Sequence, residues 1–201
     1  VFEFKLDGTV EEALAQIAAP AIRNEGTIGG NIGNGSAKAD SALVFFAADA
    51  SLKLESVRGA RILPIREFYL GRKKLALQTD ELITEVLLPL RWLESYVYQK
   101  IGARNALAIS RVSFAGLLTV ESGVIAHLSV AFGAVSDVVI RRADIDSMLI
   151  GKPITEAKAR KEAYIAAYSE AIVPTRGRVS AEYRKTVCIN LLRDFLAHFD
   201  I

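Results

Sequence analysis

Metal-binding and disulfide-forming side chains are scarce in this chain of 201 residues. It contains one cysteine, Cys188, and two histidines, His127 and His198. A single cysteine excludes a disulfide within the chain, and these three side chains are too few for the ligand sets of zinc or iron–sulfur sites. If the protein takes part in metal-based redox chemistry, we expect a partner chain to hold the metal.

The chain also lacks an excess of charge of one sign and a long apolar run. Its 25 basic and 23 acidic residues give a formal net charge of +2, and no run of basic residues is interleaved with aromatics. Nucleic acid is therefore not an expected partner. No apolar segment approaches the roughly 20 residues that span a bilayer, and the N-terminus lacks the pattern of a signal peptide. We expect a cytoplasmic protein without a membrane contact.

The first half of the chain mixes helix and strand signals. Thr9 and Glu12 form a T-x-x-E capping box at the start of an amphipathic pattern that Pro20 ends. The patterns that follow predict an apolar helix over 41–50, a hairpin from 51–57 and 60–65, a loop with a short helix over 66–81, and a strand over 82–90. We expect a domain boundary at 90–94.

The second half contains the clearest alternation in the sequence. Apolar residues alternate over 112–120 and 124–132, and only three residues separate the two runs, which predicts an antiparallel hairpin with one buried face. Helices are predicted over 142–151, 155–171 and 180–199. The last of them carries an apolar stripe, so we expect it to pack on the sheet with Arg184 turned outward. These patterns predict an α+β fold.

The stretch RNEGTIGGNIGNGSAKAD, residues 23–40, holds five glycines and three asparagines. Adjacent glycines at 29 and 30 would let consecutive amide groups point into one concave space that suits phosphate or carbonyl oxygens, and Thr27 and Asn31 would add a hydroxyl and an amide. Neither the P-loop pattern G-x-x-x-x-G-K-[ST] nor a G-x-G-x-x-G after a strand is present. Spacing alone leaves two interpretations open, a tight turn and a ligand-binding loop.

The order of several motifs is more specific than this glycine cluster. They are IAAPAIRNEGTIGGNIGNGSAKADS, DELITEVLLP, YQKIGARNALAISRVSFAG, AFGAV and VSAEYRK. With these motifs the sequence closely resembles, over essentially its whole length, the FAD-binding subunit of molybdenum hydroxylases. This is the flavoprotein of the xanthine dehydrogenase and carbon monoxide dehydrogenase group. KADS and FYLGRKKL are most similar to the bacterial xanthine dehydrogenase subunits.

The resemblance implies a domain organisation. Residues 1–91 would be the second subdomain of a PCMH-type FAD-binding domain, and residues 92–201 the flavoprotein C-terminal domain, an antiparallel sheet packed against helices. Such proteins normally carry an N-terminal subdomain whose glycine-rich loop wraps the FAD diphosphate. The chain begins with Val1 and shows no such loop. We therefore expect it to form one wall of the cofactor site and to need an upstream FAD-binding segment for tight binding.

The resemblance also implies a set of cofactor contacts. The T-I-G-G-N run would lie against the flavin and its diphosphate, and further contacts would come from an aspartate, a lysine and two branched apolar residues. The implied FAD contacts are Ile17, Thr27, Ile28, Gly29, Gly30, Asn31, Asp40, Ile83 and Lys100.

Several of these residues have a second interpretation. Asp40 would accept hydroxyl hydrogen bonds near the ribityl and phosphate part, but it also suits the N-cap of the helix that follows. Ile17 and Ile83 are core residues by default. Lys100 would reach the isoalloxazine ring and favour its anionic reduced form, whereas a lone strand lysine is usually solvated.

Two stretches depart from the family pattern. Ala21 stands where the family commonly has glutamine, and Thr175, Arg176 and Gly177 stand where it has aspartates before SAEYR. We expect these changes to alter local loops or a partner surface.

The function that the resemblance implies is electron transfer. Electrons from a substrate hydroxylated at a molybdopterin centre in one partner subunit would pass the iron–sulfur clusters of another, reach FAD here and go on to NAD or another acceptor. No residue of this chain would perform the hydroxylation; the protein would place and tune the flavin. One rival is an assembly module that does not hold FAD alone, and another is a small binder of phosphate ligands. Flavin absorbance of the purified protein separates the first function from both rivals.

Overall fold

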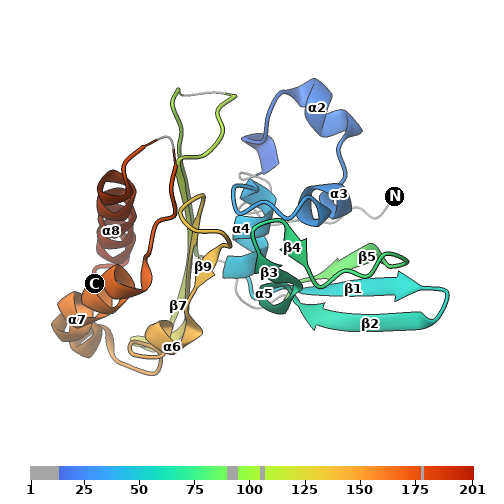
Figure 1. Ribbon diagram of the computed structural model, residues 1–201. Helices are drawn as coiled ribbons and strands as arrows, with labels where there is room; N and C mark the ends of the chain where they lie inside the picture. The colour runs from blue at the N-terminus through green and yellow to red at the C-terminus, as the bar shows by residue number, and fades with distance from the viewer. Residues whose placement is uncertain (1–13, 90–94, 105–106, 178) are drawn as a thin grey trace.

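Two groups of elements lie side by side in the computed structural model, which describes residues 14–89, 95–104, 107–177 and 179–201 (Figure 1). The first group comprises α2 (Pro20–Glu25), α3 (Ile28–Gly33), α4 (Asp40–Ala47), β1 (Ser51–Ser56), β2 (Gly59–Pro64), α5 (Ile65–Phe68), β3 (Tyr69–Gly71), β4 (Lys74–Leu75) and β5 (Leu82–Leu87). The second comprises β6 (Tyr96–Ile101), β7 (Val112–Glu121), β8 (Val124–Gly133), β9 (Ile140–Arg141), α6 (Ala143–Asp146), α7 (Ile154–Ala171) and α8 (Ala181–His198). The α+β prediction is confirmed. The capping box and the expected boundary at 90–94 lie outside the described residues.

A small antiparallel sheet with the strand order β2-β1-β5 organises the first group. Leu52 and Leu54 alternate along β1 and are fully buried, whereas Lys53, between them, pairs with Glu85 of β5 at 2.6 Å. The predicted hairpin and strand are therefore confirmed. The stretch that was predicted as a loop with a short helix forms α5 and also a two-stranded ladder of β3 and β4.

The larger sheet has the order β6-β7-β8-β9 and is antiparallel throughout. Helices α7 and α8 cover one face, and α4 covers the other (Figure 1). Phe114 and Leu118 of β7 belong to the core under the long helices, while Ala115 and Leu117 belong to the core that contains α4. The predicted hairpin is confirmed, but the expectation of a single buried face is wrong, because the first group supplies a second layer.

Helix α8 begins where the sequence predicts, with Ser180 as its N-cap accepting a hydrogen bond from the amide of Tyr183 at 3.1 Å. Its apolar stripe packs on β7, where a Cβ added at Gly116 would lie 2.5 Å from the ring of Phe195. The expectation that Arg184 points outward is wrong: this side chain is buried and donates to backbone carbonyls. No helix in the described ranges is long and apolar enough to cross a membrane.

Candidate functional site

The glycine-rich stretch forms two short helices, α2 and α3, where we expected a loop. Thr27 is the N-cap of α3, and its hydroxyl accepts a hydrogen bond from the Gly30 amide at 3.0 Å. Within the cluster only Gly35 adopts a left-handed backbone conformation, with φ +62°. Gly29 and Gly30 therefore lie in a first helical turn, whose leading amide groups have no acceptor within the helix. These amides and the helix dipole favour an anion at this end.

Gly29 has a packing reason to lack a side chain. A Cβ added there would lie 3.3 Å from the backbone oxygen of Ile83 in β5, and one added at Gly30 would lie 2.9 Å from the Thr27 hydroxyl oxygen. Helix α3 thus approaches β5 closely, and the structure brings Ile83 together with the T-I-G-G-N run. Ile28 and Ile83 are both half-buried in this contact.

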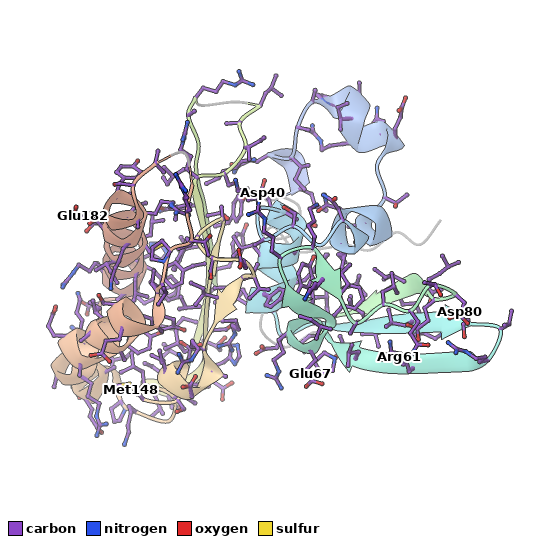
Figure 2. All side chains as sticks on the ribbon, viewed as in Figure 1. Asp40, Arg61, Glu67, Asp80, Met148 and Glu182 are labelled. Atoms are coloured by element: carbon purple, nitrogen blue, oxygen red, sulfur yellow. The ribbon has the colours of Figure 1, made fainter. Side chains whose placement is uncertain are left out.

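Asn31 connects α3 to the start of α4. Its side-chain oxygen accepts a hydrogen bond from the hydroxyl of Ser41 at 2.6 Å. The residue before Ser41 is Asp40, the first residue of α4, and it lies near the junction of the two element groups (Figure 2). This bond fixes the end of α3 beside the second cluster of candidate residues.

Asp40 and Lys100 form a buried ion pair between α4 and β6. The distance from Lys100 Nζ to Asp40 Oδ2 is 2.7 Å, and the two side chains are 8% and 6% exposed. Lys100 also donates to the backbone oxygen of Gln16 at 2.9 Å, and the buried hydroxyl of Ser110 donates to Asp40 Oδ1 at 2.8 Å. The helix N-cap is Ala39, so the Asp40 carboxylate has a role other than capping, and Lys100 is not a solvated surface lysine.

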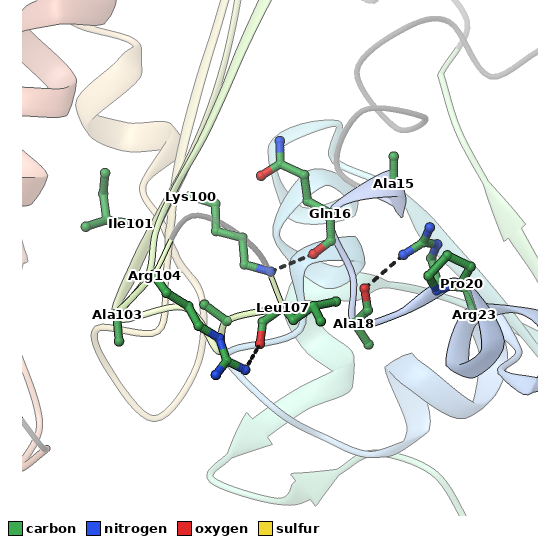
Figure 3. A pocket seen from close by; sticks show the side chains of 12 residues that line it. Ala15, Gln16, Ala18, Pro20, Arg23, Lys100, Ile101, Ala103, Arg104 and Leu107 are labelled. Carbon is green, nitrogen blue, oxygen red and sulfur yellow. Dashed lines mark hydrogen bonds between the residues drawn. The ribbon is translucent and has the colours of Figure 1, made fainter.

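A cavity of about 630 Å³ opens beside Lys100 (Figure 3). Its described lining residues include the basic side chains Arg23, Lys100 and Arg104 and no carboxylate. Arg23 Nη1 donates to the carbonyls of Ile17 and Ala18, at 2.7 and 2.9 Å, and so holds this segment at the rim. The volume is typical of a small-molecule site.

The candidate residues therefore form two neighbouring clusters. One contains Thr27–Asn31 and Ile83, and the other contains Asp40 and Lys100 next to the cavity, with Ile17 half-buried on the adjoining segment. The first cluster does not line the cavity itself. Sequence reasoning missed Arg23, Arg104 and Ser110. A motif does not tell which of its polar residues lines a cavity, as Arg23 and Arg104 do, or reaches a partner far along the chain, as Ser110 does with Asp40.

Both clusters suit FAD. The first turn of α3 offers a diphosphate the amides of Ile28 and Gly29, which have no acceptor within the helix. The half-buried isoleucines offer apolar contact to a ring, and Lys100 offers a fixed cation. Asp40 neutralises Lys100, so the pair can stay buried without an anion.

Two family models match the chain. A model described as the FAD binding domain in molybdopterin dehydrogenase matches residues 5–91, and one described as the CO dehydrogenase flavoprotein C-terminal domain matches residues 97–199.

Curated relatives and solved structures agree with these matches. The chain is 37% identical to the xanthine dehydrogenase FAD-binding subunit of Escherichia coli O157:H7 over 64% of this chain and 45% of the relative. It is 33% identical to the nicotinate dehydrogenase FAD-subunit of Eubacterium barkeri, over 72% and 50% of the two chains. A structure of the carbon monoxide dehydrogenase from Hydrogenophaga pseudoflava superposes with a TM-score of 0.82 at 26% identity, covering 91% of this chain and 63% of the other. The chain spans about half the length of the first two relatives.

Proposed function

The chain belongs to the FAD-binding flavoprotein family of the molybdopterin dehydrogenases, and we propose that it is the electron-transfer flavoprotein component of a multi-subunit molybdenum hydroxylase. In this proposal, iron–sulfur and molybdopterin-binding subunits are its partners, and electrons leave through FAD to NAD or another acceptor. Residues 1–91 form part of the FAD-binding domain and residues 92–201 the C-terminal domain. The cytoplasmic location stays a prediction.

The observation that carries the proposal is the fixed cation at the cavity. Lys100 is held by Asp40 and by the Gln16 carbonyl, and it lines a cavity of about 630 Å³ that two further basic residues share. A buried, neutralised lysine at a cavity wall is costly to form and is well placed to interact with a ligand.

Each cluster has a distinct role in the proposed site. FAD, when bound, supplies the redox chemistry by accepting and releasing electrons. The first turn of α3 would hold the diphosphate through its amides, and Ile83 with Ile28 would contact the apolar part of the cofactor. Lys100, oriented by Asp40, would supply a positive charge beside the ring. The apolar residues limit the access of water.

Substitutions within α3 test this placement. We expect Gly30→Val to abolish flavin retention in the complete assembly, because a β-branched side chain would collide with the Thr27 cap and cover the amides. Gly33→Val is the matched control: it lies in the same helix, and a Cβ there would be 3.8 Å from Ile83 Cδ1, an ordinary contact.

The measurement is bound flavin per protein after gel filtration, with far-UV circular dichroism to confirm folding. Stoichiometric FAD in Gly30→Val would contradict the placement of the cofactor on α3. An assembly whose subunits co-elute but which carries no flavin even in its unmodified form would favour the rival function of an assembly module.

A further inference from the structure

A second cavity, of about 430 Å³, lies next to the first and shares with it the lining residues Ala103, Arg104, Leu107 and Ala108. Four basic side chains from separate parts of the chain line it: Lys38, Arg104, Arg111 and Arg184. The described residues that line it include no carboxylate. Because like charges repel, an anion bound in this hollow would relieve the repulsion between the basic side chains around it.

Arg184 is the buried member of this group. It is 4% exposed, and its guanidinium donates to the carbonyl oxygens of Val135 at 3.0 Å and Ala134 at 3.4 Å, and to that of Thr175. Within the described part of the chain, its Nε has no hydrogen-bond partner and no carboxylate pairs with it. Carbonyl dipoles only partly compensate a buried charge, so a bound anion would offset the remaining cost.

Two other basic residues stand on backbone that is fixed to the sheet. The amide of Ala134 donates to the carbonyl of Ala37 at 2.7 Å, which ties the segment before Lys38 to the end of β8. The amide of Arg111 donates to the carbonyl of Ile101 at 2.8 Å, which continues the pairing of β6 with β7. The origins of both side chains are therefore set before any ligand arrives.

We propose that this cavity binds a phosphate group, either as inorganic phosphate or on a small phosphorylated molecule. A tetrahedral anion has several acceptor oxygens and can bind basic groups from different parts of the chain that line one cavity, and charge-assisted hydrogen bonds of this kind are strong. The cavity adjoins the candidate FAD site and shares Arg104 with the first cavity, but Lys100 does not line it. Ser110 lies between the two sites, with its hydroxyl donated to Asp40.

The test is calorimetric titration of the purified protein with inorganic phosphate and, separately, with adenosine 5′-monophosphate. We expect saturable binding of one phosphate per chain. Lys38→Gln and Arg111→Gln should each weaken it by about tenfold or more, since each removes one charge-assisted contact. Arg66→Gln, which removes an exposed charge on α5, should leave the affinity unchanged. Arg184 is left intact, because it also supports the fold.

The results separate this site from the flavin site, because flavin content is measured on the same samples. Tighter binding of the nucleotide would identify a nucleotide-borne phosphate, and equal binding would identify the free anion; both support the site. Absence of saturable binding, or equal weakening in Arg66→Gln, would overturn the proposal. Loss of flavin from Lys38→Gln or Arg111→Gln would also overturn it, since the cavity would then be part of the flavin site.

Discussion

Two regions of this molecule each bury a carboxylate beside a basic side chain, and their surroundings are opposite. One is the contact between the two groups of elements, where Asp40 of α4 pairs with Lys100 of β6 at the wall of a cavity. The other is the core of the second group, where Asp146 is fully buried and pairs with Arg141 at 2.5 Å, beneath α7. The same chemistry thus appears once next to a space where a ligand can bind and once inside a closed core.

The hydrogen-bond partners of the two carboxylates also differ. Asp146 accepts hydrogen bonds from the hydroxyls of Tyr164 and Tyr168, each at 2.7 Å, and its partner Arg141 also pairs with Asp49, which follows α4 in the first group. Burial raises the pKa of Asp146 to about 6, against the opposing effect of Arg141 and the hydroxyls. The partner of Asp40, Lys100, instead donates a second hydrogen bond to the carbonyl of Gln16, which lines the cavity. We infer that the Asp146 network is structural and that the Asp40 pair belongs to the candidate site.

The largest effect is expected from breaking the closed network. Asp146→Asn places an amide donor against the Arg141 guanidinium and leaves Arg141 and the two tyrosine hydroxyls with fewer acceptor oxygens, so we expect a loss of about 3–5 kcal/mol in the free energy of unfolding. Chemical denaturation measures it. Asp144→Asn is the control, because this neighbouring carboxylate is exposed and pairs with Arg142 on the surface, where such pairs contribute little. Equal effects of the two changes would refute a special role for the closed network.

A smaller effect is expected from pH. The folded pKa of Asp146 lies above its unfolded value of 3.8, so the folded state binds more protons between the two values. The contribution of Asp146 to stability is therefore present below about pH 4 and is lost as the pH rises to about 6, by roughly 2 kcal/mol from pH 4.5 to 6.

Other carboxylates act in the opposite direction at lower pH. Arg61 lowers the pKa of Glu81 to about 2, and Arg142 does the same for Asp144, so their stabilisation is lost as the pH falls below about 4.5. These titrations overlap the window from pH 4.5 to 6, so the effect of Asp146 is taken from the difference between the unmodified protein and Asp146→Asn. Thermal unfolding across this window should show that the stability advantage of the unmodified protein over Asp146→Asn shrinks as the pH rises. An advantage that does not change with pH would contradict the raised pKa.

The sequence predicted what depends on local pattern. The β7–β8 hairpin and the start of α8 follow from alternation, a short turn and a serine N-cap, all within about twenty residues. The buried state of Arg184 could not be predicted, because its acceptors Ala134 and Val135 lie about fifty positions away. A surface-like pattern on one helix does not indicate that a neighbouring turn will cover it.

In the candidate site, too, the sequence predicted the local motif but not the conformation or the long-range contacts. The T-I-G-G-N run was recognised as a motif, but its helical conformation was not predicted, because spacing alone does not distinguish a helix capped by Thr27 from a loop. The pairing of Asp40 with Lys100 joins residues sixty positions apart, and it exists only because α4 packs on the sheet that contains β6. This contact depends on packing between distant parts of the chain, which no local sequence pattern predicts.

The smallest effect is expected at the flavin, and it sharpens the comparison most directly. Lys100→Met removes a cation and leaves the Asp40 carboxylate, so negative charge on the reduced ring becomes less favourable and the midpoint potential should fall by tens of millivolts, where roughly 30 mV corresponds to 1.4 kcal/mol for two electrons. Lys158→Met, at an exposed lysine of α7 that pairs with Asp200 at 2.9 Å, is the matched control and should leave the potential unchanged. Spectroelectrochemical titration of the flavin-loaded assembly measures both. If Lys100→Met lowers only the stability and leaves the potential where it was, the Asp40 pair is structural like that of Asp146, and the two regions no longer differ in function.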